Sequence, residues 1–166
     1  MTLIHTAFFN EAKPIIEHFK LQFITKEPIK LYKNDSILLA ISGMGEKTLH
    51  VKEITQKYEI SKAINIGIAG CKDKSIQIGE LFCTNKKLNN IPFATLSCSK
   101  EPIDSPNKIK TTLVDMESSY FLEATKDIED RYIFKVVSDY LDINVPKKEF
   151  VWKIISKSIE KWEHYV

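Results

Sequence analysis

The chain has 166 residues, of which 43% are hydrophobic and 28% are charged, so it is long enough to bury a substantial core. Its 24 basic residues nearly balance its 22 acidic residues, and a formal net charge of +2 argues against a dedicated nucleic-acid binder. Because no apolar stretch is long enough to span a bilayer and no cleavable signal begins the chain, we expect a cytoplasmic protein with no membrane partner.

Apolar periodicity and turn residues predict alternating strands and helices along the chain. The expected elements are, in order, a strand at 3–9, a helix presenting Ile15, Ile16 and Phe19, strands at 21–24, 28–32 and 36–41, a helix at 46–57, strands at 63–70, 77–83 and 93–97, a strand ending at 113–114 before a helix, a strand at 132–137 and a helix at 147–164. This alternation predicts an α/β protein with three αβα layers around a central mixed twisted sheet, organised as one domain over residues 1–166.

Some local details follow from residue type. Pro14 fits only near the first turn of its helix, where backbone donors are still free, and Asn34-Asp35 favours a hairpin. In the last helix, Phe150, Val151, Ile154, Ile155, Ile159 and Trp162 recur at helical spacing, which indicates core or oligomer packing.

Acidic residues follow three of the predicted strands. Glu11 follows the first strand, Asp115 and Glu117 flank Met116 after the strand ending at Val114, and Asp139 follows Ser138 after another. Ligands of open α/β sheets bind outside the carboxyl ends of strands, so these acids are expected to face one crevice. The alternative interpretations are a solvated helix-start acid for Glu11, a helix cap or turn acid for Asp139, and plain core for Met116.

Glycines end two of the predicted strands. Ser42-Gly-Met-Gly45 and the pair Gly67 and Gly70 would let the backbone approach a bound anion or ligand, although a tight strand-to-helix turn explains the first motif equally well.

The V-D-M-E of Val114–Glu117, the V-V-S-D ending at Asp139 and the G-I-A-G ending at Gly70 resemble the nucleoside phosphorylase superfamily, and within it the methylthioadenosine/S-adenosylhomocysteine nucleosidases. The resemblance implies that Asp139 protonates the departing purine, with Ser138 fixing its rotamer, and that Glu11 activates water. It implies that Glu117 binds the ribose hydroxyls with Met116 against the sugar. Asp115 matches a family acid, and Gly70 and the loop carrying Ile103 are expected to border the ligand.

The chain also departs from the family pattern. Ile68 stands where the family has Ser or Thr, Cys71 replaces a glycine, and the segment after Cys83 is much shorter. Lys135 stands where many of these hydrolases carry arginine, and the alternative interpretation is a solvated side chain with no role in the site.

The function expected from the resemblance is hydrolysis of a purine nucleoside such as methylthioadenosine or S-adenosylhomocysteine, with no cofactor. The alternatives are a nucleoside-binding module without turnover, a purine nucleoside phosphorylase, or a structural flavodoxin-like domain. The lone arginine, Arg131, is remote in sequence from the glycine turns, which favours water over phosphate.

Further expectations concern metals, cysteines and assembly. The four histidines are scattered without metal-ligand spacing, and Cys71, Cys83 and Cys98 are odd in number and widely spaced, which favours reduced thiols and no metal site. A homodimer is expected, as for the enzymes resembled, with Trp152, Trp162 and Tyr165 adding aromatic surface to the last helix.

Overall fold

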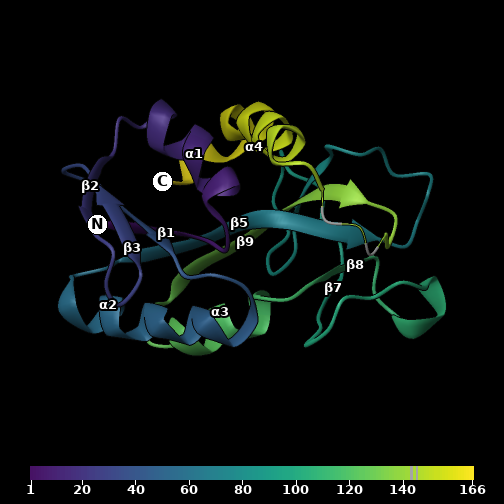
Figure 1. Cartoon of the computed structure of the whole chain (residues 1–166), viewed down its shortest axis with the longest axis horizontal. Coiled ribbons are helices and arrows are strands. Elements are labelled where there is room, and N and C mark those ends of the chain that lie inside the picture. Colours follow the sequence, from purple (N-terminus) through teal and green to yellow (C-terminus); the bar gives the residue numbers. More distant parts are fainter. Residues whose placement is uncertain (143, 145) are drawn as a thin grey trace.

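The structure is a computed structural model that describes residues 1–142, 144 and 146–166. Its centre is a mixed nine-stranded sheet, with α1 and α4 on one face and α2 and α3 on the other (Figure 1). The elements are β1 (Thr2–Thr6), α1 (Phe9–His18), β2 (Gln22–Thr25), β3 (Lys30–Lys33), β4 (Ile37–Ile41), a 3₁₀ segment (Gly45–His50), α2 (Val51–Lys57), β5 (Lys62–Cys71), β6 (Leu81–Cys83), β7 (Leu96–Cys98), a 3₁₀ turn (Pro106–Lys108), β8 (Leu113–Asp115), α3 (Ser118–Ala124), β9 (Asp130–Asp139), α4 (Lys148–Trp162) and a final 3₁₀ turn (Glu163–Tyr165). The predicted αβα layering is confirmed.

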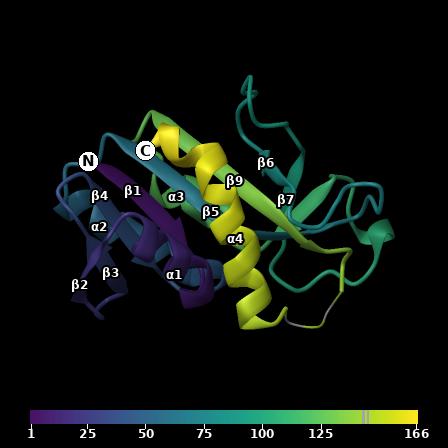
Figure 2. The ribbon, with the colours of Figure 1, turned by 90° about the horizontal axis from the view of Figure 1, so that it is seen from above.

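The central strands are buried on both faces, which explains their continuous apolar sequences. Along β4, Leu39 and Ile41 join the core under α1 and α4, whereas Leu38 and Ala40 join the core over α2 and α3. Seen from above, α4 lies across β5 and β9 (Figure 2). Its apolar stripe is therefore core, and Trp162 is fully buried. The expectation that Trp162 adds aromatic surface for a partner is wrong, while Trp152 is exposed.

The sheet topology opens a gap beside β5. One edge of β5 pairs with β9 along most of its length, from Lys62 to Gly70. The other edge pairs with β1 as far as Asn65, and then with β8 from Gly70 onward. Within the described residues, positions 66–69 of β5 have no strand neighbour on that edge, so their backbone groups are free to meet side chains and ligands.

A β-bulge shapes the end of β9. Ala69 pairs with Val137 and Gly70 pairs with Asp139, so Ser138 is the extra residue. Bulges re-aim side chains beside functional sites, and this one sets the direction of Asp139.

Several expected elements differ in extent from the observed ones. β1 ends at Thr6 because residues 7 and 8 turn into α1, and the expected helix at 46–57 begins as the 3₁₀ segment. The expected strand at 77–83 is reduced to β6, since Gly79 turns with a φ of +93°. Pro14 lies inside α1 beyond its first turn, contrary to expectation, and α1 tolerates the missing N–H there.

The hairpin at Asn34-Asp35 is confirmed by the antiparallel pairing of β3 with β4. In the described chain, no helix has both the length and the apolar character needed to cross a bilayer.

Candidate active site

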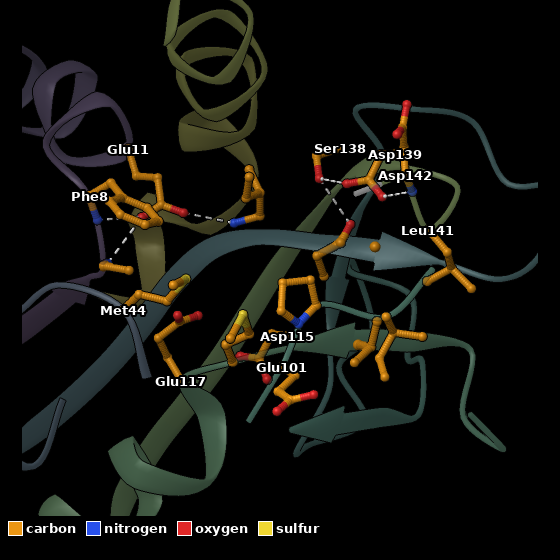
Figure 3. Close-up of a pocket in the computed structure, with 18 residues that line it drawn as sticks. Phe8, Glu11, Met44, Glu101, Asp115, Glu117, Ser138, Asp139, Leu141 and Asp142 are labelled. Carbon is orange, nitrogen blue, oxygen red and sulfur yellow. Dashed lines mark hydrogen bonds between the residues drawn. The ribbon is translucent and has the colours of Figure 1, made fainter. Parts of the chain in front are cut away.

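A cavity of about 170 Å³ lies beside the ends of β1 and β8. All eight residues expected to form the site line it: Glu11, Gly70, Ile103, Asp115, Met116, Glu117, Ser138 and Asp139. Glu11 approaches the cavity from one side and Asp139 from the other, with Glu117 and Asp115 between them (Figure 3). Segments far apart in the sequence therefore deliver carboxylates to one crevice at the strand ends.

Glu11 is held by backbone donors. It is the third residue of α1, and its Oε2 accepts the N–H groups of Ala7 at 3.0 Å and Phe8 at 2.9 Å, so it caps its own helix. Its Oε1 accepts the N–H of Ile68 at 3.1 Å, across the gap beside β5. Only 2% of Glu11 is exposed, which excludes a solvated helix-start acid. The cap fixes the carboxylate while leaving it at the cavity wall.

Glu117 and Asp115 are held by different partners on either side of Met116. Glu117 Oε1 accepts the N–H of Gly45 at 3.3 Å, and Gly45 has a φ of +66° that favours glycine. Asp115 accepts the Ser118 N–H at 3.0 Å and the Ser118 hydroxyl at 2.6 Å. Asp115 Oδ2 also lies 2.7 Å from Lys135 Nζ.

Lys135 is buried, with 1% exposure, which excludes the alternative interpretation of a solvated side chain. The strand β9 is covered on both faces, and a polar residue in its middle must point into the protein. No local pattern in the sequence marks Lys135 as part of the site, because its partner Asp115 is distant in sequence.

Asp139 ends β9 at the opposite side of the cavity. Its Oδ2 accepts the Ser138 hydroxyl at 2.6 Å and its Oδ1 accepts the Asp142 N–H at 3.0 Å. The next helix begins at Lys148, so Asp139 is a turn acid and not a helix cap. A Cβ on Gly70 would lie 3.2 Å from Asp139 Oδ1 and 3.1 Å from Leu141 Cδ2, which explains the glycine there.

Burial dominates the electrostatics of the two glutamates. It raises the pKa of Glu11 to about 7, against the opposing effects of the Phe8 and Ile68 N–H groups and of Lys135, while Glu117 raises it further. Burial also raises the pKa of Glu117, and Lys135 opposes that rise. For Lys135, burial lowers the pKa, but Asp115, Glu117 and Glu11 outweigh it and the net pKa is raised, so Lys135 is charged at neutral pH.

A second buried polar group lies close to the site and was not anticipated from the sequence. His5 on β1 is fully buried, its Nδ1 lies 2.8 Å from Asn65 Nδ2, and its Nε2 lies 2.7 Å from Ser42 Oγ. The Ser42 hydroxyl donates to the Gly43 carbonyl at 2.8 Å. Burial, with the nearby Lys135 charge, lowers the pKa of His5 to about 3, so the ring is neutral. This histidine network (His5, Asn65 and Ser42) supports the turn that carries Gly45.

Other cavity residues escaped sequence reasoning because they carry no chemical signature. Phe8, Met44, Glu101 and Leu141 line the cavity. Arg131 lies at the other end of β9 and donates to the Leu122 carbonyl at 3.2 Å. Within the described residues, the cavity wall contains no lysine, arginine or histidine, and no group of three or more potential metal ligands occurs.

Comparison with solved structures decides the fold. The chain superposes on a futalosine hydrolase mutant of Helicobacter pylori with a TM-score of 0.82 and 15% identity, covering 98% of this chain and 96% of that one. It superposes on a methylthioadenosine/S-adenosylhomocysteine nucleosidase of Helicobacter pylori with a TM-score of 0.83 and 16% identity, covering 98% of this chain and 96% of that one. The nucleosidase of the same kind from Campylobacter jejuni superposes with a TM-score of 0.80 and 18% identity, covering 96% of this chain and 95% of that one. The chain has the nucleosidase fold. The expected likeness in fold to these nucleosidases is thus confirmed. No protein-family model matches the sequence, and no curated protein does either.

Proposed function

We propose that the protein hydrolyses the N-glycosidic bond of a purine nucleoside, such as methylthioadenosine or S-adenosylhomocysteine. The observation that carries this proposal is the meeting of Glu11, Glu117 and Asp139 at one cavity, each held by its own hydrogen-bond donors. These three side chains supply the chemistry, because one fold can host many activities and the site determines which one it performs.

The chemistry needs a proton for the departing base and stabilisation of a ribosyl centre that becomes positively charged. Asp139 supplies the proton in this proposal, and the Ser138 hydroxyl orients it. Glu117 accepts hydrogen bonds from the ribose hydroxyls with Met116 against the sugar. Glu11, whose pKa burial raises to about 7, changes charge near neutral pH, and its ionised form takes a proton from the attacking water.

The charges of the cavity favour water over phosphate. Glu11, Asp115, Glu117 and Asp139 all line it, and in the part of the chain that the structure describes no basic side chain does. A phosphate dianion beneath the sugar would meet the carboxylates of Glu11 and Glu117, and no basic side chain of the described cavity wall would hold it. This observation disfavours the alternative of a purine nucleoside phosphorylase.

A nucleoside-binding module without turnover remains the second candidate, because Ile68 replaces the family hydroxyl and the segment after Cys83 is short. Ile68 contributes its backbone N–H to Glu11, and no side chain is needed for that contact. The acids at both sides of the cavity favour the enzyme over this alternative, because a module that only binds a nucleoside has less need of both.

The cavity is smaller than the roughly 300–1,000 Å³ of most small-molecule sites. We expect the wall formed by Ile103 and Leu141 to move outward when a nucleoside enters. These residues belong to a small apolar cluster with Ile109 and Val114 that is separate from the main core, so its opening costs little packing.

A homodimer in the cytoplasm is part of the proposal. Phe8 and Met44 at the cavity, and Phe9 and Trp152 nearby, are exposed apolar side chains suited to a partner surface. Sedimentation at micromolar concentration tests the assembly, and a species with the mass of one chain would contradict it.

The test of the activity is incubation of the pure protein with methylthioadenosine, S-adenosylhomocysteine, adenosine and inosine, followed by measurement of free base. We expect release from at least one adenine nucleoside, at the same rate with and without phosphate, and with free sugar as the second product. Formation of a sugar 1-phosphate would make the protein a phosphorylase. Binding without base release would make it a binding module.

A further inference from the structure

Lys135 is the buried cation nearest the proposed reaction. Its Nζ lies 2.7 Å from Asp115 Oδ2, and both side chains are almost completely buried. Among the described residues it is the only buried lysine or arginine. A buried ammonium is costly unless it is paired, so its position must be sustained by the acids around it.

Gly67 creates the space in which this cation meets the site. Gly67 on β5 is the cross-strand partner of Lys135 on β9. A Cβ at Gly67 would lie 3.6 Å from Lys135 Nζ and only 2.9 Å from Glu11 Oε1. The missing side chain therefore leaves one pocket beside β5 that is shared by the ammonium and the Glu11 carboxylate.

Three carboxylates on three different segments are close enough to feel this charge. Asp115 pairs with it directly, while Glu117 and Glu11 each raise the pKa of Lys135. The attraction acts on both partners, so Lys135 in turn lowers the pKa of Glu11 and of Glu117. Without the cation, three buried carboxylates would compete to stay ionised in one site, and protons would be taken up.

We propose that Lys135 is a positioning residue, the buried counter-ion that decides which of Asp115, Glu117 and Glu11 is ionised at neutral pH. It pairs with Asp115, keeps Glu117 available as an acceptor for ribose, and keeps Glu11 poised to accept a proton from water. It touches no reacting atom in this role. The inference rests on the proposed function only for its kinetic readout.

The other charged groups around Glu11 do not replace Lys135. His5 on β1 is neutral, Glu117 beside α3 has the same sign as Glu11, and the N–H groups of Ala7, Phe8 and Ile68 carry only partial charges. Lys135 is therefore the one full positive charge that acts on Glu11 within the described site.

The experiment compares Lys135→Met with the double variant Asp115→Asn/Lys135→Met. The single variant leaves Asp115 buried without a partner and is expected to lose stability, so it alone would not separate folding from function. The double variant removes the pair together. Lys62→Met is the control, because Lys62 lies at the far end of β5 and pairs with the surface residue Asp130.

The first readout is the pKa of the Glu11 carboxyl group, measured by following its infrared band as the pH is changed. The band is assigned to Glu11 because it disappears in the variant Glu11→Gln. We expect the pKa of Glu11 to rise by about 1 to 3 pH units in both Lys135 variants, since they lose an opposite charge at short range. The control should titrate as the wild type does. If Lys135 serves only to neutralise Asp115, the double variant titrates as the wild type, and the proposal is overturned.

The second readout is the pH profile of kcat/KM for base release. At pH 7 both Lys135 variants should be at least about fivefold slower than the wild type, because fewer molecules hold an ionised Glu11. The difference should shrink toward alkaline pH, which a merely structural defect would not produce. A constant ratio at all pH values would refute the role.

The two readouts separate the inference from the proposed function. If no nucleoside is hydrolysed but the Glu11 band shifts, the proposed activity fails and the assignment of Lys135 stands. If the double variant hydrolyses nucleosides with an unchanged Glu11 titration, the activity stands and the role of Lys135 fails.

Discussion

Two groups of buried or half-buried polar side chains lie beside the same sheet, and they find their hydrogen-bond partners in different ways. The cavity-facing carboxylates (Glu11, Glu117 and Asp139) are held by N–H and hydroxyl donors but still line an open space. In the histidine network, both ring nitrogens of His5 are used by protein partners. The carboxylates can therefore act on a ligand, whereas the network can only support the fold.

The direction of the pKa shifts shows the same physics acting on opposite charges. Burial disfavours the charged form, so it raises the pKa of Glu11 and lowers that of His5. The pKa of Glu11 becomes about 7, so a small change in pH near neutrality alters the charge of its carboxyl group. The pKa of His5 becomes about 3, so its ring stays neutral at that pH. Burial therefore lets Glu11 gain or lose a proton near neutral pH and keeps His5 neutral there.

The largest expected effect comes from Asp139→Asn. The amide can still accept the Asp142 N–H, and the Ser138 hydroxyl can turn toward the Ala69 carbonyl 3.3 Å away, so the local structure should persist. Base release should fall by about 10² to 10⁴-fold, because the lost proton acts in the transition state. Nucleoside binding, measured by calorimetry, should stay within about tenfold.

The matched control for this variant is Asp130→Asn at the opposite end of β9, where the carboxylate pairs with Lys86 on the surface. It should leave turnover unchanged. Weakened binding with normal turnover in Asp139→Asn would contradict the proton-donor role.

Glu117→Gln should weaken binding and turnover together. Contacts to ribose exist in the ground state as well as in the transition state, and a hydrogen bond to a charged group contributes about 1.5 to 3 kcal/mol. Affinity should therefore fall by roughly tenfold or more, as measured by titration with a nucleoside. Glu123→Gln, on the exposed face of α3, is the control. Unaltered affinity in Glu117→Gln would remove Glu117 from the sugar site.

The pH dependence of turnover tests the role of Glu11. Its pKa is raised to about 7, so the ionised base is lost as the pH falls through 7. Below that pH, kcat/KM should drop by about tenfold for each pH unit. Glu11→Gln should show low activity without this limb, while the exposed Glu17→Gln should keep it. A wild-type rate that is constant from pH 8 to pH 5 would exclude Glu11 as the base.

The smallest effect on turnover is expected for His5→Asn, which instead tests the histidine network through stability. The pKa of His5 is lowered, so its contribution to stability is present above the unfolded pKa of 6.5 and is lost as the pH falls toward 3. Between pH 7 and pH 4 the stability advantage of the wild type over the variant should shrink by about 3 kcal/mol. Denaturant unfolding at both pH values measures it.

Glu11 acts in the opposite direction over the same range. Because its pKa is raised from 4.5, the folded state takes up a proton as the pH falls from 7, and stability rises. The comparison of His5→Asn with the wild type cancels this common term. If the stability difference is independent of pH, His5 is not held neutral by the fold.

Much of the fold could be predicted because its signals are local. The runs at 36–41, 63–70 and 132–137 are apolar and bounded by turn residues, and the stripe of α4 repeats at helical spacing, so strands and helices could be placed to within a few residues. The acids at strand ends could be found for the same reason, since Glu11, Glu117 and Asp139 each follow a strand pattern directly.

The charge arrangement depends on contacts that no local pattern records. Whether Lys135 is solvated or buried depends on the coverage of β9, and whether Trp162 faces a partner or the core depends on how α4 lies on the sheet. Leu141, with a φ of +64°, reaches the cavity only through the turn after β9.

The sequence by itself determined the alternation of strands and helices and the positions of the strand-end acids, because both depend on neighbouring residues. Only the tertiary structure decided how those acids are charged. The early end of β1 and the space left by Gly67 let Glu11 lie close to Lys135, and the bulge at Ser138 directs Asp139 toward the same cavity. Burial and distance then set each pKa, and both are properties of the folded chain.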